Sequence, residues 1–471
     1  MRISRRLVVL LCLVLVGSLV LSLPGRAGQA GPDPQYRFQL NRFTQVFDLI
    51  ILASAQQVSF RQLIDGAISG MLEVLEDPAA QHFTPEAHQR HIEQMEGVFG
   101  GIGISLTMED GAPVVLQVFP GTPAERAGIM PRDLILEADG RGLIGLGLDA
   151  IVTLIRGEAG TAITLRISRP GVDEPFTRQL LREIIRVRSV ESRLLEAGVG
   201  YLRITGFQAG TAAEARQALQ ALRDQGIRGL ILDLRDNGGG LLDQAVETAS
   251  LFLPQGPVVR IRGRAGISQF RHGHGAGFDL PLVVLVNGRT ASAAEIVAGA
   301  IQDYRAGLLV GTRTFGKATV QSIFQLLDGG ALKLTTANYF TPIGRAIHGQ
   351  GLQPDEVVPE AERAGLLPEA AILLQYRRTL TRGIVGLDVL SLQERLNQLG
   401  LAGGEEDGVL GEATERAVRE FQRSAGLPVT GAVDAATVDA LNRARMPHPE
   451  PAVVRDTQLE RGVAIIRGQL R

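Results

Sequence analysis

The stretch from Gly198 to about Thr341 alternates short apolar runs with helical patterns, and this alternation most limits what the chain can fold into. The run Leu282–Val286 contains only leucine and valine, as in strands that are buried on both faces. We expect strands at 199–204, 230–234, 282–286, 308–310, 320–326 and 331–338, and helices at 211–225, 241–251 and 292–304. Strands that alternate with helices in this way predict a layered α/β core.

Composition excludes several classes of protein. The 471 residues suggest about three domains, and 45% hydrophobic residues exclude wholesale disorder. Because 48 Lys and Arg nearly balance 50 Asp and Glu, no broad basic field exists and nucleic acid is not an expected partner. Cys12 is the single cysteine, so an intramolecular disulfide, a cysteine-ligated zinc site and a thiol nucleophile in the folded part are excluded. We expect no cofactor.

The N-terminus predicts export from the cytoplasm. Arg2, Arg5 and Arg6 precede an apolar run from Leu7 to Leu23, and small residues follow it. This order is typical of a secretory signal peptide, which we place at residues 1–30. An uncleaved membrane anchor is the alternative, because the run is at the short edge for a membrane span. Both interpretations place the rest of the chain in the periplasm or outside the cell.

Five further segments follow from the patterns along the chain. Residues 36–96 have apolar side chains at helical spacing, and Asp77-Pro78 ends the second helix there. Residues 97–172 contain short β-like runs rich in glycine. The α/β core follows at 173–355, with a connecting helix and linker at 356–385 and a compact helical unit at 386–445. Residues 446–471 form a tail without a clear pattern.

Two strand-to-helix junctions in the core could carry chemistry. In the first, Asn237 is followed by Gly238, Gly239 and Gly240, whose uncovered N–H groups at a helix start suit a phosphate or an oxyanion. A tight turn without a ligand is the alternative. In the second, Ser292 opens a helix with Glu295 three residues later. That spacing is a capping box, which by itself explains the serine without any catalysis.

Lys317 makes a nucleophilic serine possible. It stands in a glycine turn before a strand, among small and apolar neighbours, with Gln321 four residues later. A serine hydroxyl needs a base to attack, and a lysine can be that base only where burial keeps its amine neutral. An exposed structural lysine is the alternative.

The core motifs resemble the carboxyl-terminal processing peptidases, also called tail-specific proteases. The segments that carry this resemblance are Leu232–Gly240, Val286–Ile296, Gln302-Asp303, Val310–Gln321 and Gly351–Asp355. The resemblance implies a crotonase-like α/β protease core. It also implies that Ser292 is the nucleophile, Lys317 the general base and Gln321 the residue that orients the lysine. The family's oxyanion hole would be formed here by the N–H groups of Gly239, Gly238 and Ala293.

Some residues depart from the family pattern. Positions 289, 290 and 294 hold Arg, Thr and Ala where small residues or serine are usual, and Ala318 replaces a common glycine. None of these changes removes Ser292, Lys317 or Gln321. Arg289, so close to the nucleophile, leaves the substrate preference and the rate open.

Residues 97–172 resemble an inserted PDZ domain, through Gly100–Ser105, Pro120–Gly128 and Leu134–Asp139. PDZ domains add a peptide strand to a sheet edge and hold its terminal carboxylate with loop N–H groups. The resemblance implies that Gly101, Ile102, Gly103 and Arg156 contact the substrate. An ordinary surface role is the alternative for Arg156. His272 and His274 lie in a glycine-rich segment that we expect to be a mobile loop, and we expect no metal there.

Residues 386–445 resemble the three-helix type of peptidoglycan-binding domain, in which Leu390, Leu392, Leu396, Leu399 and Phe421 would form the core. The resemblances together imply a serine endopeptidase that recognises protein C-termini and is held at the cell wall. An inactive wall-bound PDZ scaffold is the alternative, and a weaker one makes peptidoglycan itself the substrate. Because some relatives in this family dimerise through their N-terminal helical segment, the resemblance also implies a homodimer.

Overall fold

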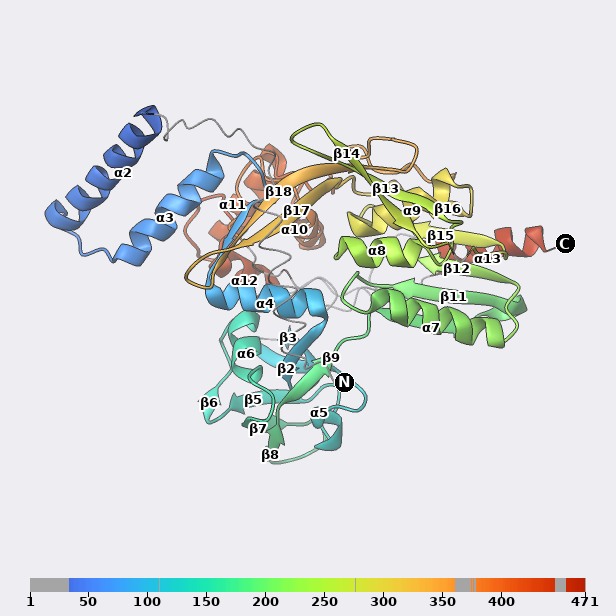
Figure 1. Ribbon diagram of the computed structural model, residues 1–471. Helices are drawn as coiled ribbons and strands as arrows, with labels where there is room; N and C mark the ends of the chain where they lie inside the picture. The colour runs from blue at the N-terminus through green and yellow to red at the C-terminus, as the bar shows by residue number, and fades with distance from the viewer. Residues whose placement is uncertain are drawn as a thin grey trace, which may run out of the picture. The chain divides into compact units, whose positions relative to one another are not determined.

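The computed structural model describes residues 34–109, 111–275, 277–360, 374, 376, 378–444 and 455–470 (Figure 1). The chain divides into two units, with the boundary after Val74. The predicted signal peptide, residues 1–30, lies outside the described residues. Within the described ranges, none of the helices has an apolar stretch long enough to span a membrane.

The first unit consists of α2 (Pro34–Ala53) and α3 (Phe60–Glu73), as the apolar spacing predicts. Ser59 caps α3 by accepting a hydrogen bond from the N–H of Gln62, whose side chain returns to the N–H of Ser59. The Phe47 and Phe60 rings stack with centroids 5.9 Å apart. Most other apolar side chains of these helices are exposed, including Phe38, Phe43, Val46, Leu49 and Leu52.

A six-stranded sheet forms the centre of the second unit. Its order is β10 (Val190–Leu194), β11 (Val199–Ile204), β12 (Gly229–Asp233), β15 (Leu282–Val286), β16 (Leu308–Gly311) and β19 (Glu356–Val357). All pairings are parallel except that of β10 with β11. The crossover helices are α7 (Thr211–Asp224), α8 (Leu242–Ala249) and α9 (Ala293–Asp303). The predicted α/β core is confirmed, except that Glu356 and Val357 extend the sheet where a connecting helix and linker were expected.

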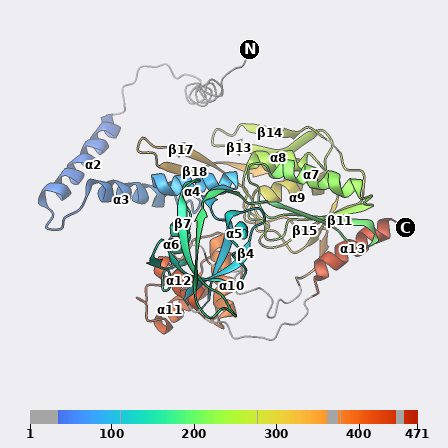
Figure 2. The same cartoon turned by 90° about the horizontal axis from the view of Figure 1, so that it is seen from below.

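The tail at residues 446–471 carries no clear sequence pattern, yet part of it forms a helix. Residues Thr457–Gln469 form the helix α13, which lies on the face of the sheet opposite α7, α8 and α9 (Figure 2). Alternation along β12 explains the two layers: Leu230 and Leu232 pack with the crossover helices, whereas Ile231 packs with the buried Ile466 of α13. The last helix of the chain therefore completes the core.

A five-stranded antiparallel sheet lies beside the central one. It contains β1 (Gln81–Phe83), β13 (Gly256–Gly263), β14 (Ser268–Gly273), β17 (Thr319–Gln325) and β18 (Ala331–Phe340). The sequence patterns indicated β17 and β18 but missed β1 and the β13–β14 hairpin. His272 therefore lies in strand β14 rather than in the expected mobile loop. The helix α4 (Pro85–Glu96) follows β1, with Thr84 as its N-cap.

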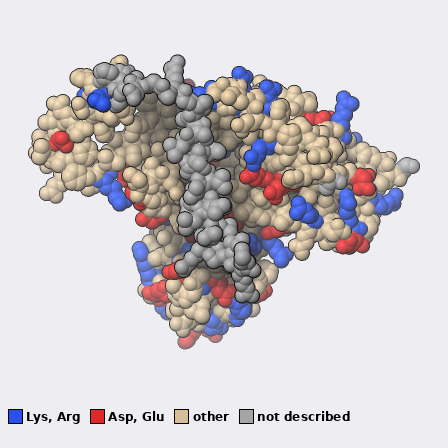
Figure 3. All heavy atoms as spheres, in the orientation of Figure 1, with Lys and Arg blue, Asp and Glu red and all other residues tan. Residues whose placement is uncertain are grey.

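The predicted PDZ region forms a separate antiparallel sheet around its own apolar core. Its strands are β3 (Ile104–Glu109), β4 (Ala112–Val118), β5 (Leu134–Ala138), β6 (Arg141–Gly142), β7 (Ala162–Ser168) and β8 (Phe176–Leu181). Its helices are α5 (Pro123–Arg126) and α6 (Leu148–Ile155), and β2 (Val98–Gly101) pairs with β9 (Glu183–Arg186) beside it. In the face that Figure 3 shows, acidic and basic side chains are interspersed over this region.

The helical unit near the C-terminus contains α10 (Leu387–Gln398), α11 (Glu412–Ser424) and α12 (Ala435–Arg443). Leu390, Leu392, Leu396 and Phe421 are buried, as predicted. Asp434 caps α12 by accepting a hydrogen bond from the N–H of Thr437. We refer to residues 386–444 as the three-helix domain.

Candidate active site

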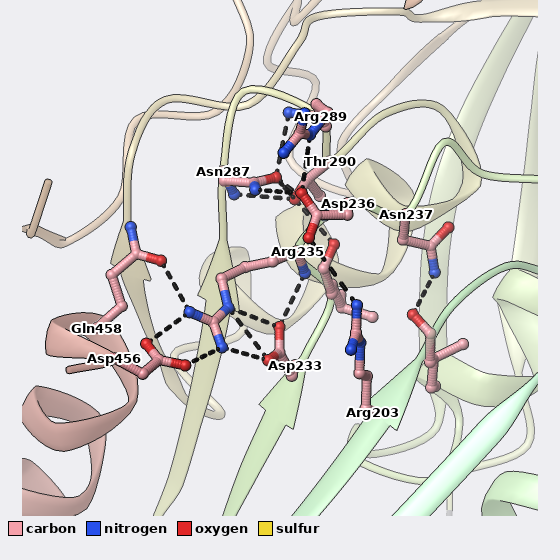
Figure 4. Close-up of polar contacts among 12 residues, drawn as sticks. Arg203, Asp233, Arg235, Asp236, Asn237, Asn287, Arg289, Thr290, Asp456 and Gln458 are labelled. Atoms are coloured by element: carbon pink, nitrogen blue, oxygen red, sulfur yellow. Dashed lines mark hydrogen bonds and ion pairs between the residues drawn. The ribbon is translucent and has the colours of Figure 1, made fainter. Parts of the chain in front are cut away.

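Two neighbouring parallel strands, β12 and β15, end at the same edge of the sheet, and their following loops are joined there (Figure 4). The Asn287 side chain accepts a hydrogen bond from the N–H of Asp236 at 3.0 Å and donates one to its carboxylate at 2.8 Å. Arg289 Nε donates to the same carboxylate at 2.8 Å. This network brings the glycine loop and the serine turn side by side.

Ser292 occupies an unusual backbone conformation at the start of α9. Its φ is 56° and its ψ is −118°, a combination of backbone angles that residues other than glycine rarely adopt. Such a conformation costs about 1–3 kcal/mol and persists only where the surroundings enforce it. A serine on a sharp turn between a buried strand and a helix is also how α/β hydrolases present a nucleophile.

Gly239 lies directly against this serine. A Cβ atom on Gly239 would stand 2.7 Å from Ser292 Cβ and 2.9 Å from the backbone nitrogen of Ala293. The position also has a φ of +99°, so glycine is required for two independent reasons. The Gly239 N–H donates to the side-chain oxygen of Asn237 at 2.9 Å. One of the three predicted oxyanion donors is therefore engaged within its own loop.

The buried carboxylate of Glu295 joins the serine turn to the lysine loop. It accepts hydrogen bonds from the N–H groups of Ser292 at 2.9 Å, Gly316 at 2.8 Å and Lys317 at 2.9 Å, and from Thr314 Oγ1 at 2.6 Å. Burial raises the pKa of Glu295, and these four hydrogen bonds oppose the rise. The capping-box interpretation explains only the contact of Glu295 with Ser292. The same carboxylate also binds the loop of Lys317.

Tyr339 on β18 makes a second connection between the two segments, and the sequence analysis missed it. Its hydroxyl lies 2.8 Å from the carbonyl oxygen of Ser292 and 2.7 Å from that of Lys317. Burial, together with the charge of Glu295, raises the pKa of Tyr339 well above its ordinary value, so the hydroxyl remains a donor. No motif marks this tyrosine, since only strand pairing brings it to the site.

Lys317 is half-buried between β16 and β17. Only two of the chain's 48 Lys and Arg residues are lysines, the other being Lys333. Gln321 lies on β17, just after a bulge in its pairing with β18, and its amide donates to Thr319 Oγ1 at 2.7 Å. The structure thus places the predicted serine, lysine and glutamine on neighbouring segments, which Glu295 and Tyr339 connect by hydrogen bonds.

Of the predicted peptide-contacting residues, Gly101, Ile102 and Gly103 lie just before β3, an edge strand of the PDZ sheet, and Arg156 follows α6. Gly101 ends β2, Ile102 is buried, and Gly103 has a φ of +84° with its carbonyl accepting the N–H of Phe119. The Arg156 guanidinium lies 4.1 Å from the centroid of the Phe99 ring, and burial lowers its pKa. Arg156 is thus packed on an aromatic ring.

Within the described ranges, no three His, Cys, Asp or Glu side chains come close enough together to hold a metal ion. His272 and His274 therefore have no third ligand among these residues.

Comparison with known proteins identifies the fold. Residues 198–358 match the sequence profile of peptidase family S41. The carboxy-terminal processing protease CtpA of Bacillus subtilis is 31% identical over 467 residues, which cover 98% of each chain. The carboxy-terminal-processing protease of Bartonella bacilliformis is 41% identical over 330 residues, 68% of this chain and 75% of that one. The chain belongs to peptidase family S41.

Further matches cover the other segments of this S41 peptidase. Residues 114–169 match a PDZ domain, 385–441 a peptidoglycan-binding domain and 26–86 the N-terminal domain of the activating protease CtpB. Among solved structures, the photosystem II D1 C-terminal processing protease is 34% identical, covering 68% of this chain and 86% of its own, with a TM-score of 0.42. The predicted family and its additional domains are confirmed.

Proposed function

We propose that this S41 peptidase is a serine endopeptidase that works outside the cytoplasm, with Ser292 as nucleophile and Lys317 as general base. The observation that carries the proposal is that two side chains, Glu295 and Tyr339, each contact the backbone of both residues. Glu295 accepts from both backbone N–H groups, and the Tyr339 hydroxyl lies within hydrogen-bond distance of both carbonyl oxygens. A nucleophile and its base must be held in register for proton transfer.

The reaction begins when Ser292 Oγ attacks the carbonyl carbon of a peptide bond and its proton moves to the neutral amine of Lys317. The N–H groups of Gly238 and Ala293, joined by Gly239 once its N–H leaves Asn237, stabilise the oxyanion. The tetrahedral intermediate collapses, the C–N bond breaks, and the Lys317 ammonium gives its proton to the departing amine. Water then attacks the acyl-enzyme with Lys317 again as base. Gln321 would orient the lysine amine.

The additional domains suggest how substrates reach the serine. The PDZ domain would bind protein C-termini along β3, through Gly101, Ile102, Gly103 and the neighbouring Arg156. The three-helix domain would hold the enzyme at peptidoglycan. The predicted leader at residues 1–30 would deliver it to the periplasm or the cell exterior. The exposed apolar side chains of α2 and α3 would be covered in a homodimer, because soluble proteins rarely leave such faces open.

Cleavage of an unfolded protein tests the proposal. Ser292→Ala and Lys317→Ala should each abolish turnover, whereas Ser322→Ala, a change on β17 outside the proposed site, should retain it. Turnover close to that of the unmodified enzyme in either of the first two variants would contradict the assignment. Absence of turnover in the unmodified enzyme, together with no labelling of Ser292 by a serine-reactive probe, would favour the inactive PDZ scaffold.

A further inference from the structure

Arg289, the residue that departs most from the family pattern beside the nucleophile, pairs with the three-helix domain. Its Nη1 lies 2.6 Å from Glu394 Oε1 on α10, while its Nε holds Asp236 of the glycine loop. The side chains of Arg289 and Glu394 are only 22% and 13% exposed. Burial raises the pKa of Glu394, which the positive charge of Arg289 opposes. An ion pair this enclosed is a specific contact rather than a loose surface pair.

The other two loops of the proposed site touch the same domain. A Cβ atom on Gly238 would lie 3.0 Å from Leu387 Cδ1, at the first residue of α10. The Phe315 ring, two residues before the lysine, packs against Gly408, where a Cβ atom would lie 2.7 Å from a ring carbon. The loops that carry the oxyanion donors, the serine and the lysine therefore each contact the three-helix domain.

The same domain also reaches the peptide-capture edge of the PDZ region. The helix α12 contacts β3, and Asp439 on α12 lies against Gly147, just before α6. Met108 of β3 and Asn442 of α12 line one small gap between the two domains. A peptide that adds to β3 must extend along this edge. Such a peptide would therefore run past α12, which contacts the same strand.

We propose that the three-helix domain, residues 386–444, is an internal cover of the protease, docked over the serine, lysine and glycine loops and over the edge of β3. Substrate enters after the domain moves away, so the docked and open forms are two states in equilibrium. The engaged N–H of Gly239 fits this resting form. The inference rests on the proposed function, because it assigns a regulation to that site.

A disulfide between the PDZ region and the cover tests this directly. Gly147 has an ordinary φ of −68°, and a Cβ atom there would lie 2.8 Å from Asp439 Cγ. The two Cβ atoms therefore come within disulfide range. We would examine the full chain with Gly147→Cys, Asp439→Cys and Cys12→Ala, before and after oxidation. The single-cysteine variants Gly147→Cys and Asp439→Cys, each with Cys12→Ala, serve as controls.

The oxidised double variant should form the intramolecular disulfide and cleave an unfolded protein at least about tenfold more slowly than its reduced form. Reductant should restore the rate, and oxidation should leave the single-cysteine controls unchanged. Failure of the disulfide to form would overturn the docked position. A complete disulfide with undiminished turnover would overturn the cover.

A charge reversal tests the same equilibrium from the other side. Glu394→Arg places two like charges together at the serine turn, so turnover should rise by about 5- to 150-fold, the range of ordinary couplings between sites. Glu412→Arg, on the exposed side of α11, is the matched control and should change nothing. An unchanged rate in Glu394→Arg would contradict the cover. If no form cleaves substrate, the proposed function fails, while the yield of the disulfide still reports the docked position.

Discussion

Arginine supplies nearly all of the positive charge of this chain, and Lys317 is one of the two exceptions. A guanidinium stays protonated in proteins, whereas a lysine amine in a suitable environment loses its proton and acts as a base. Elsewhere, the second lysine, Lys333, donates a hydrogen bond to Gln81 between β18 and β1, and an arginine can do the same. Under the proposed mechanism, the residue type therefore matters at Lys317 but not at Lys333.

We predict opposite outcomes for the same substitution at the two lysines. Lys317→Arg keeps the positive charge but removes the base, so turnover should fall by about 100-fold or more. Lys333→Arg should stay within about twofold of the unmodified enzyme, because an exchange of donors away from the site changes stability only slightly. Initial rates on an unfolded protein measure both. Equal losses in the two variants would show that Lys317 matters for folding rather than for catalysis.

Gly239 offers a second comparison at the residue scale. Gly239→Ala and Gly210→Ala both place an alanine at nearly the same positive φ, +99° and +101°. Only Gly239 has neighbours, and its new Cβ would displace Ser292. Turnover should fall by about 100-fold in Gly239→Ala and by less than threefold in Gly210→Ala, at matched thermal stability. Similar rates in the two variants would place Gly239 outside the site.

Among the elements, the strand-to-helix junctions were predictable from the sequence, because an apolar run followed by glycine or serine and then a helical pattern leaves few alternatives. The packing of α13 was not. Its larger apolar side chains, Leu459, Val463, Ile465 and Ile466, are few, and only the tertiary structure reveals the face of the sheet that they cover. Tyr339 was missed for the same reason.

The family motif also holds α13 in place. Asp233 and Arg235 lie in the segment that carries the family resemblance, and Arg235 binds Asp456, the N-cap of α13, through two contacts of 2.8 Å (Figure 4). Tyr201 donates to Asp233 at 2.8 Å. Polar contacts therefore join the final helix to the end of β12, the strand that leads into the glycine loop.

We predict that α13 contributes to the stability of the core. Ile466 is fully buried on β12 and β15, so Ile466→Ala should lower the free energy of unfolding by about 2–5 kcal/mol. The exposed Gln469→Ala, in the same helix, should change it by less than about 0.5 kcal/mol. Hydrogen exchange of the β12 and β15 amides in the full chain measures both. Unchanged protection in Ile466→Ala would mean that α13 is dispensable.

At the scale of the molecule, the order of the domains was predictable because each has its own motif. The contact between the three-helix domain and the protease loops could not be predicted. It depends on Arg289, Leu387 and Gly408, and no sequence motif indicates which residues these three contact. From the sequence, the effect of Arg289 on substrate preference and rate stayed open. The structure gives it a partner, Glu394, in another domain.

The proposed mechanism requires that Ser292 is a nucleophile and that Lys317 activates it. A covalent serine-reactive probe, followed by peptide mapping, tests this most directly. We predict a stoichiometric adduct on Ser292 that forms faster in Glu394→Arg and is lost in Lys317→Arg. Cleavage of an unfolded protein with Ser292 unmodified, or an adduct on another serine, would contradict the account.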